Sequence, residues 1–459
     1  MRRRGGRTLT AFAFVVLGAV ACAKEHESLI IVGLTAPQPI SGLRSVAITA
    51  GGTTQTYDVH ALDSTTPTQV GIYVPSSATG TVMVAANVDA GGCVAYVGQQ
   101  SATIAAAGAT TTVEIPLASS LGCSCTEYDH NDPSAPCDLT TSPTTNDTYN
   151  MAAVFSPDGQ FLATAGSDQR VKIWRFDGST ITPEGHVIAT DAGATSLPAP
   201  PGAKVAFSPD GKLMAIAQWG QPGDPVLLYD VATWTQLRQL TGPPDYVIDV
   251  GFTPDGQHVV ALDATGMGGG AVYTLSANTG KSDFSETLTF DPILVSVSTV
   301  AGSGGIPVAV SSSDGRAAMM QLTSTGFTTP QIFTVTSDGS FTYAINFSPD
   351  GTQLAAGGDD AMFHLWTVPL PVSGQPDGAP FVVGNMNGVT MLAFAPNAPY
   401  IAAAAGNLGR EVSVWDLASR ARLGAFMPSY LPTAISYAPS GNAIAGGEIH
   451  CGKIFLCTR

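Results

Sequence analysis

Charged side chains are scarce in this chain. They make up 12% of its 459 residues, about half of the usual share of roughly 25%. Basic residues are the scarcer kind, with 19 Lys and Arg against 35 Asp and Glu, and the formal net charge is −16. Because binding to a phosphate backbone depends on clustered Lys and Arg, we exclude nucleic acid as a partner.

The chain also lacks a membrane-spanning run at its start. Four arginines lie in the first seven residues, an apolar run from Ala11 to Val20 follows, and small residues precede Cys22. The run is shorter than the roughly 20 residues that cross a bilayer. Residues 1–21 are therefore predicted to be a secretory signal peptide.

The four residues from Ala19 to Cys22 resemble the lipobox of bacterial lipoproteins. The resemblance implies that the thiol of Cys22 is acylated and that residues 22–28 form a lipidated tether. It also implies an exported protein anchored to a lipid bilayer, in the periplasm or at the cell surface of a bacterium. The alternative is plain secretion with a differently cleaved leader.

Six further cysteines remain, and an even number in an exported protein indicates disulfides. Cys451 and Cys457 are six residues apart on a predicted strand. That is about 20 Å at roughly 3.3 Å per residue, whereas a disulfide needs Cα atoms within about 7 Å. We expect one of the two to bond to a cysteine of residues 122–149. A zinc site with His130 or His450 is the alternative, which an oxidising compartment disfavours. The disulfide candidates are Cys93, Cys123, Cys125, Cys137, Cys451 and Cys457.

Residues 29–121 alternate apolar and polar side chains, as in "SVAITA" and "TQVGIYV". Period two, β-branched residues and Gly-rich breaks predict about seven strands, and we expect a small immunoglobulin-like β-sandwich domain. Residues 122–149 are polar and rich in Ser, Thr, Pro and Cys, which predicts a linker.

From residue 150 onward, the chain repeats an aromatic residue, a Pro-Asp-Gly turn and an alanine-rich stretch, as in "VAFSPDGKLMAIA" at 205–217. The spacings between aromatic residues are 52, 45, 95, 47 and 43. The double interval contains a degenerate copy with Thr299 in the aromatic position, so the copies number seven. The aromatic residues are Phe155, Phe207, Phe252, Phe347, Phe394 and Tyr437.

Each copy predicts a small sheet. Pro supplies a fixed φ and Gly accepts a positive one, so the first two strands meet in a tight turn, and two more strands follow. One such sheet cannot bury both faces, whereas a ring of sheets can. The expected fold class is all-β, with a seven-bladed β-propeller at residues 150–459 preceded by the sandwich.

"VWD" at Val414–Asp416 and "LYD" at Leu228–Asp230 resemble the signature of the WD-repeat family of β-propellers. The Gly-His dipeptide of that family occurs only at Gly185-His186, away from its usual place. Propellers of this kind close by pairing their first and last segments in one blade. We expect residues 138–148 to supply the missing fourth strand of the last blade.

The sequence contains none of the common catalytic motifs that we considered. The chain has no G-x-S-x-G, no H-E-x-x-H and no phosphate-cradling glycine loop, so we expect no enzyme activity, no cofactor and no metal. Acids recur at the turns between second and third strands, where they either cap turns or form a platform for a basic partner or a cation. These partner-binding candidates are Asp168, Asp224, Asp263, Asp314, Asp359, Asp360 and Glu448.

The leading hypothesis is a membrane-anchored, extracytoplasmic, non-enzymatic scaffold whose propeller binds a protein partner. One alternative is a propeller enzyme of lactonase or hydrolase type, which would need His, Arg or carboxylate groups in the central channel. The other is a carbohydrate or cell-wall binding protein that stacks sugars on Trp219 and Trp234.

Overall fold

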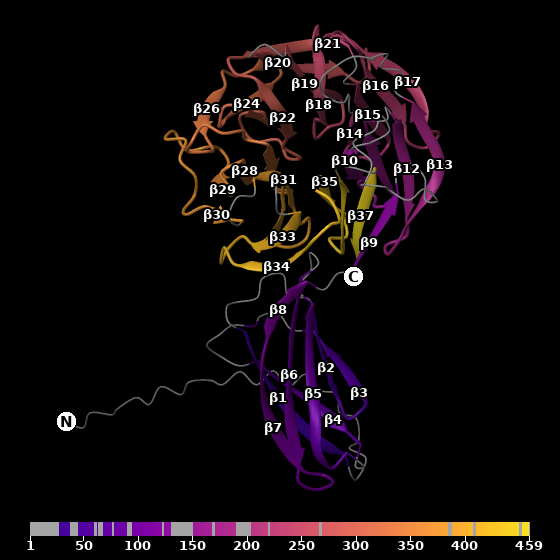
Figure 1. The fold of residues 1–459 in the computed structure, drawn as a ribbon, viewed down its shortest axis with the longest axis vertical. Coiled ribbons are helices and arrows are strands. Elements are labelled where there is room, and N and C mark those ends of the chain that lie inside the picture. The colour runs from indigo at the N-terminus through magenta and orange to yellow at the C-terminus, as the bar shows by residue number, and fades with distance from the viewer. Residues whose placement is uncertain are drawn as a thin grey trace, which may run out of the picture.

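The computed structural model describes residues 27–36, 45–58, 62, 68–75, 78–89, 94–121, 124–129, 150–167, 170–189, 203–218, 221–265, 269–383, 388–406, 410–448 and 452–458. The regular elements in these ranges are β-strands, which confirms the all-β class (Figure 1). Within the same ranges, no helix has the length and apolarity needed to cross a membrane.

Two sheets form the N-terminal part of the structure, and we call them the N-terminal sheets. One has the order β4-β1-β7 and the other β3-β2-β5-β6-β8. Alternating side chains are buried, as Val46 and Ile48 in β2, and join the core that contains Val32 of β1. The strands are β1 (Ser28–Thr35), β2 (Ser45–Ala50), β3 (Thr53–Tyr57), β4 (Thr68–Val74), β5 (Gly80–Asp89), β6 (Val94–Ile104), β7 (Thr110–Pro116) and β8 (Ala118–Leu121).

Seven further sheets occur in the described residues, and we number them ring sheets 1 to 7 in chain order. Their paired strands are antiparallel, as the repeated tight turns predict. Ring sheet 1 contains β10 (Asn150–Phe155), β11 (Phe161–Gly166), β12 (Arg170–Phe176) and β13 (Ile181–Ala189). Ring sheet 2 contains β14 (Ala203–Phe207), β15 (Leu213–Gln218), β16 (Val226–Asp230) and β17 (Thr235–Leu240). Ring sheet 3 contains β18 (Tyr246–Phe252), β19 (His258–Ala264), β20 (Gly270–Ser276) and β21 (Ser282–Leu288).

Ring sheet 4, which contains the degenerate copy, has its outer position divided between β25 and β26, both paired with β24. Its strands are β22 (Pro292–Val297), β23 (Ile306–Ser312), β24 (Arg316–Thr323), β25 (Gly326–Phe327) and β26 (Gln331–Thr334). Ring sheet 5 contains β27 (Ala344–Phe347), β28 (Gln353–Gly357), β29 (Met362–Thr367) and β30 (Phe381–Val382). Ring sheet 6 contains β31 (Val389–Phe394), β32 (Tyr400–Ala405), β33 (Glu411–Asp416) and β34 (Arg422–Phe426).

Ring sheet 7 combines two distant parts of the chain. It contains β35 (Pro432–Tyr437), β36 (Ala443–Glu448), β37 (Lys453–Thr458) and β9 (Ser124–Asp129), and β37 pairs antiparallel with β9. A disulfide joins Cys125 to Cys457 across this pair, which confirms that Cys457 bonds to a cysteine of residues 122–149. The strand beside β37 thus comes from within the expected linker. The prediction that residues 138–148 supply this strand is therefore wrong, because β9 occupies the position beside β37; residues 138–148 themselves lie outside the described residues.

The ring sheets are arranged around a common centre, consistent with a β-propeller (Figure 1). The first strand of each ring sheet contacts the first strand of the next, and β35 of ring sheet 7 contacts β10 of ring sheet 1. The second strands are small and buried, as in "YIAAAA" of β32, because neighbouring sheets crowd together near the centre. At Gly447 of β36 an added Cβ would lie 2.6 Å from the Cβ of Asn150 in ring sheet 1.

Side chains of the first strands bond to the inner edge of the following sheet. The Asn346 side-chain amide donates to the carbonyl of Leu392 at 3.0 Å, and the Thr390 hydroxyl donates to the carbonyl of Pro432 at 3.2 Å. The Thr433 hydroxyl donates to the carbonyl of Asn150, from ring sheet 7 to ring sheet 1. These bonds satisfy backbone groups that an unpaired strand edge would leave free.

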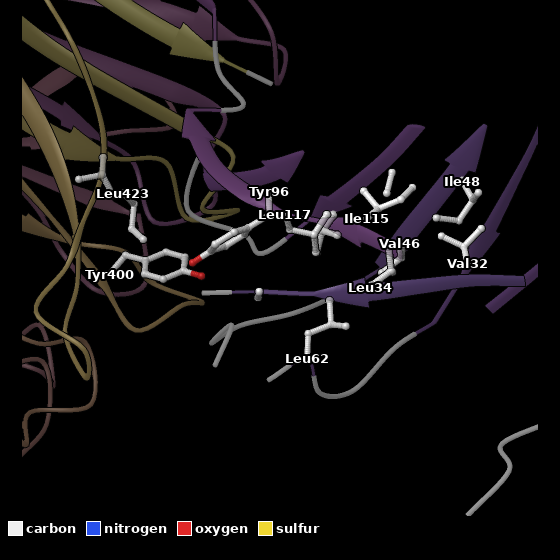
Figure 2. Close-up of a cluster of buried hydrophobic side chains, with 14 of the residues drawn as sticks. Val32, Leu34, Val46, Ile48, Leu62, Tyr96, Ile115, Leu117, Tyr400 and Leu423 are labelled. Atoms are coloured by element: carbon white, nitrogen blue, oxygen red, sulfur yellow. The ribbon is translucent and has the colours of Figure 1, made fainter. Parts of the chain in front are cut away.

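The N-terminal sheets pack against the rim of the ring. Strand β8 contacts β34, the outer strand of ring sheet 6, and Tyr96 and Leu117 belong to the same buried cluster as Tyr400 and Leu423. Figure 2 shows the hydroxyl ends of Tyr96 and Tyr400 pointing toward each other across this contact. The two parts of the chain therefore share a core instead of being joined by a tether alone.

Candidate functional site

The strand order gives the ring two different faces. Because successive strands are antiparallel, the turns between first and second strands lie on one face, together with those between third and fourth strands. The turns between second and third strands, and the connections between ring sheets, lie on the opposite face. We call the first the PDG face and the second the acidic face.

On the PDG face, the repeated Asp serves its own turn. The Ser208 hydroxyl donates to Asp210 at 2.7 Å, and this carboxylate also accepts from the backbone of Lys212 at 3.1 Å. These bonds lower the pKa of Asp210. Gly211 follows with a φ of 70°, which a residue with a Cβ rarely adopts. Local hydrogen bonds therefore explain the shape of this repeated turn.

The acids named from the sequence that the structure describes fall on the acidic face, with very different exposure. Asp263 and Glu448 are buried, whereas Asp359 and Asp360 are partly exposed in the turn between β28 and β29. Asp314 is bonded to Arg316, Asp224 accepts from the backbone of Gln221 at 2.6 Å, and Asp168 lies outside the described residues.

Glu448 is the most perturbed of these acids. Its side chain is 0% exposed. One carboxylate oxygen accepts from the backbone of Tyr430 at 3.0 Å, and the other has no hydrogen-bond partner. Burial, reinforced by Glu127, raises the pKa of Glu448 to about 8. Glu127 itself is held by Lys453 at 3.0 Å. A carboxyl group enclosed in this way has no path to a substrate.

Asp263 is similarly withdrawn from the surface. It is 2% exposed and accepts from the backbone of Ala271 at 2.7 Å. Burial raises its pKa, and the nearby Asp245 adds to this effect. Asp263 and Glu448 are both buried and both accept hydrogen bonds from nearby backbone groups, so neither presents its carboxyl group at the surface. The accessible charge of the acidic face therefore comes from other residues.

Sequence reasoning did not name several acids of this face. Asp245, Asp291 and Asp338 lie in connections between ring sheets, and all three are at least partly exposed. In "PPDYV" and "FDPIL" the acid comes directly before a first strand. For Asp245 and Asp291 this position is a signal that could have revealed them. The start of a first strand lies on the same face as the turns between second and third strands, where the sequence analysis looked for acids.

The inner strands contain one charged pair that the sequence analysis overlooked. Lys204 of β14 and Asp249 of β18 both lie three residues before the repeated aromatic, in adjacent sheets. Asp249 accepts from the backbone of Val295 at 2.9 Å. Burial lowers the pKa of Lys204 and raises that of Asp249, while their mutual attraction opposes both shifts. Asp249 thus bridges β18 and β22, which is a structural role.

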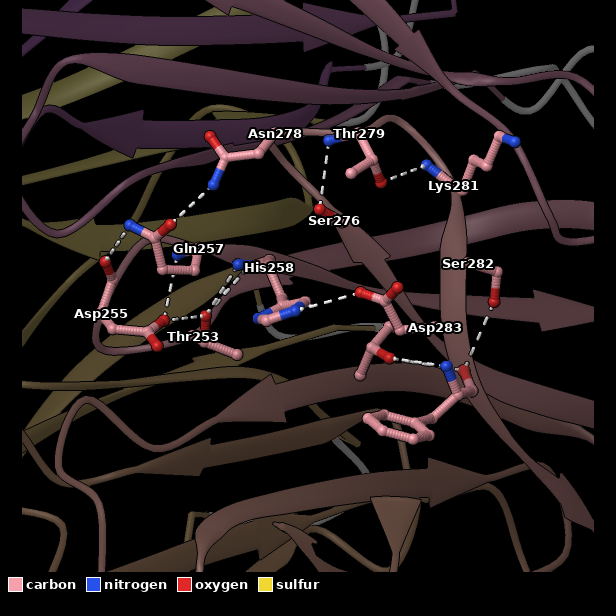
Figure 3. Close-up of polar contacts among 12 residues, drawn as sticks. Thr253, Asp255, Gln257, His258, Ser276, Asn278, Thr279, Lys281, Ser282 and Asp283 are labelled. Carbon is pink, nitrogen blue, oxygen red and sulfur yellow. Dashed lines mark hydrogen bonds and ion pairs between the residues drawn. The ribbon is translucent and has the colours of Figure 1, made fainter. Parts of the chain in front are cut away.

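A shallow groove between ring sheets 3 and 4 lies on the PDG face. Its volume is about 600 Å³, and His258, Asp255, Asp283 and Phe284 are among the residues that line it. Figure 3 shows the His258 imidazole directed at Asp283, with Nε2 3.1 Å from the carboxylate. Asp255 is engaged by the Thr253 hydroxyl at 2.6 Å. The polar groups that could act on a ligand are thus bonded to one another.

Other residues considered from the sequence give no reactive site. In the part of the chain that the structure describes, no three His, Cys, Asp or Glu side chains converge as metal ligands. Trp234 packs edge-on against Phe161 at 5.2 Å, whereas Trp219 lies outside the described residues. So do the lipidation candidate Cys22 and the disulfide candidates Cys93, Cys123, Cys137 and Cys451.

These features define a protein with small antiparallel sheets arranged around a centre, whose turns and connections form its two faces. Residues 140–175 and 330–367 each match the family model described as WD domain, G-beta repeat. The matches include β10 to β12 and β26 to β29, the copies that combine a complete Pro-Asp-Gly turn with Trp174 or Trp366. No curated protein matches the chain. WD repeats are thus supported at two of the copies recognised in the sequence.

Proposed function

We propose that the chain is an exported lipoprotein whose seven ring sheets form a β-propeller that binds a protein partner without catalysis. In this proposal residues 1–21 are the signal peptide, Cys22 carries the lipid, and residues 22–28 are the tether. The N-terminal sheets, at residues 29–121, are an immunoglobulin-like domain between the membrane and the propeller. The WD-repeat matches support the scaffold role, since WD domains generally mediate protein–protein interactions.

The observation that carries the proposal is the position of the N-terminal sheets. They contact β34 at the rim and Tyr400, which begins β32 at its PDG end. Among the described residues, these contacts with the ring thus lie toward the PDG face, and we propose the opposite, acidic face as the surface that binds a partner. Binding surfaces of propellers are formed by such loops at one face, supported by a rigid ring.

The charge of the acidic face favours a basic partner. Asp224, Asp338, Asp359 and Asp360 are at least partly exposed there, on a chain with a net charge of −16. Such a surface attracts basic proteins over distances near the Debye length, so added salt should slow association. The buried Glu448 and Asp263 are not part of this surface.

Affinity capture from detergent-solubilised membranes tests the proposal. The wild-type chain should retain a protein partner, and the triple variant Asp224→Asn, Asp359→Asn and Asp360→Asn should lose most of it. Salt at about 0.5 M should weaken capture similarly, because it screens exposed charges. Absence of any retained protein would refute the scaffold function.

A matched triple variant provides the control for lost charge. Glu184, Asp283 and Glu286 lie on the outer strands β13 and β21, away from the acidic face. Their replacement by the corresponding amides removes the same formal charge and should leave capture unchanged. Equal losses in the two variants would contradict a role for the acidic face.

The membrane anchor is tested separately. The variant Cys22→Ser should move the protein from the membrane fraction to the soluble fraction of the producing bacterium, and it should abolish incorporation of labelled fatty acid. A Cys22→Ser variant that remains in membranes would contradict the anchor and leave the scaffold proposal intact.

A further inference from the structure

An exposed pair of aromatic rings lies on the acidic face between ring sheets 4 and 5. The rings of Phe341 and Tyr343 are stacked, with centroids 5.4 Å apart and an interplanar angle of 5°. Phe341 is 43% exposed. Both residues belong to the connection that leads from β26 to β27. The pair therefore presents an aromatic surface at this face, of the kind against which cations and planar groups pack.

The connection is fixed in place by backbone hydrogen bonds. Asp359 N donates to the carbonyl of Phe341 at 3.0 Å, and Thr342 N donates to the carbonyl of Ser312 at 2.9 Å. At Gly358 an added Cβ would lie 2.0 Å from the same Phe341 carbonyl oxygen. The aromatic pair is thus anchored to the turns of ring sheets 4 and 5 and presented on a rigid base.

Three carboxylates lie beside the aromatic pair. Asp359 and Asp360 occupy the turn that bonds to Phe341, and Asp338 lies three residues before Phe341. Asp338 accepts from the hydroxyl and backbone of Ser340 at 2.6 and 3.0 Å, which lowers its pKa and keeps it ionised. We call Asp338, Phe341, Tyr343, Asp359 and Asp360 the aromatic-acidic patch.

Two carboxylates of the patch, Asp338 and Asp360, lie close enough to affect each other. Burial raises the pKa of Asp360, and the nearby Asp338 adds to this shift. No basic side chain of the described residues forms an ion pair with Asp338 or Asp360. The nearby Arg316 is engaged by Asp314 through Nε at 2.9 Å. A cation supplied by another molecule therefore meets no competing ion pair from the described residues at Asp338 or Asp360.

We propose that the aromatic-acidic patch binds an arginine side chain in a basic segment of the protein partner. A guanidinium group is planar, so it stacks on an aromatic face while its N–H groups donate to adjacent carboxylates. The inference rests on the proposed scaffold function and names the residue type that the acidic face recognises. A metal ion is a poorer fit, because no three acidic ligands of the described residues converge here.

Calorimetric titration with a hexa-arginine peptide tests the inference directly. Phe341→Ala should weaken the affinity about five-fold, as expected for the loss of one cation–π contact. Phe341→Tyr retains a ring and should bind as wild type does. Asp338→Asn combined with Asp360→Asn should weaken binding about ten-fold, through the loss of two carboxylates. A hexalysine peptide should bind more weakly and depend less on Phe341, because ammonium groups do not stack.

The control variant is Ile332→Ala. Ile332 is also 43% exposed but lies on β26, at the outer edge of ring sheet 4, and its loss should leave the titration unchanged. Equal affinities of wild type and Phe341→Ala would overturn the inference, as would equal losses in Phe341→Ala and Ile332→Ala. Partner capture by Phe341→Ala that equals capture by wild type would also overturn it, while the absence of any partner would refute the scaffold function itself.

Discussion

The disulfide between Cys125 and Cys457 closes a loop of very large size, and its removal has a calculable effect. The two residues are 332 apart in sequence. Cross-linking such a loop reduces the entropy of the unfolded chain, and the loop-closure relation gives about 6 kcal/mol as an upper value at 25 °C. The paired strands β9 and β37 keep their backbone hydrogen bonds in the double variant Cys125→Ser, Cys457→Ser. We therefore expect a folded protein with a much lower free energy of unfolding.

Urea unfolding followed by tryptophan fluorescence measures the effect, with wild type and the double variant compared with and without dithiothreitol. The reductant should shift the wild-type midpoint toward that of the variant and should change the variant much less. Peptide mapping under non-reducing conditions identifies the Cys125–Cys457 bond. A variant within about 1 kcal/mol of wild type would refute the loop-closure reasoning.

Three further predictions concern Glu448, Asn346 and Leu423. Since the fold raises the pKa of Glu448 to about 8, wild type should lose stability as pH rises from about 5.5 to about 7.5, by roughly 2–3 kcal/mol, and Glu448→Gln should lack this slope. Identical slopes in urea titrations would contradict the assignment. Asn346→Ala should cost about 1–2 kcal/mol by leaving the Leu392 carbonyl unpaired; a neutral result in thermal unfolding would count against it. Leu423→Ala should cost about 2–4 kcal/mol and separate the calorimetric unfolding of N-terminal sheets and ring; one unchanged transition would argue against a shared core.

The repeating architecture could be predicted from the sequence because it depends on local chemistry. Each Pro-Asp-Gly turn specifies its two strands through bonds within five residues, as between Ser208, Asp210 and Leu213. Even the degenerate copy forms a sheet, ring sheet 4. The assignment of Thr299 to the aromatic position was wrong, because Val297 ends the first strand β22 where the other copies have their aromatic residue. Its divided outer position, β25 and β26, had no signal in the repeat, since outer strands vary freely in sequence.

The contacts between distant segments could not be predicted in the same way. The sequence predicted a disulfide from either Cys451 or Cys457 to a cysteine of residues 122–149, but it could not select Cys457, because the pairing of β9 with β37 depends on tertiary packing across the ring. The burial of Glu448 follows from its contact with the Tyr430 backbone, which no pattern in "AIAGGE" indicates. Phe341 and Tyr343 belong to no repeat, so their stacking became visible only in the structure.

The pairing of β9 with β37 also affects the order in which the protein can mature. A nascent chain that enters an oxidising compartment from its N-terminal side presents Cys125 long before Cys457 emerges, since 332 residues separate them. Until then the thiol of Cys125 is available to other cysteines, and native oxidation must follow complete translocation. If the chain is exported as we propose, its biogenesis should depend on disulfide isomerisation late in export, more than on the rate at which individual sheets form.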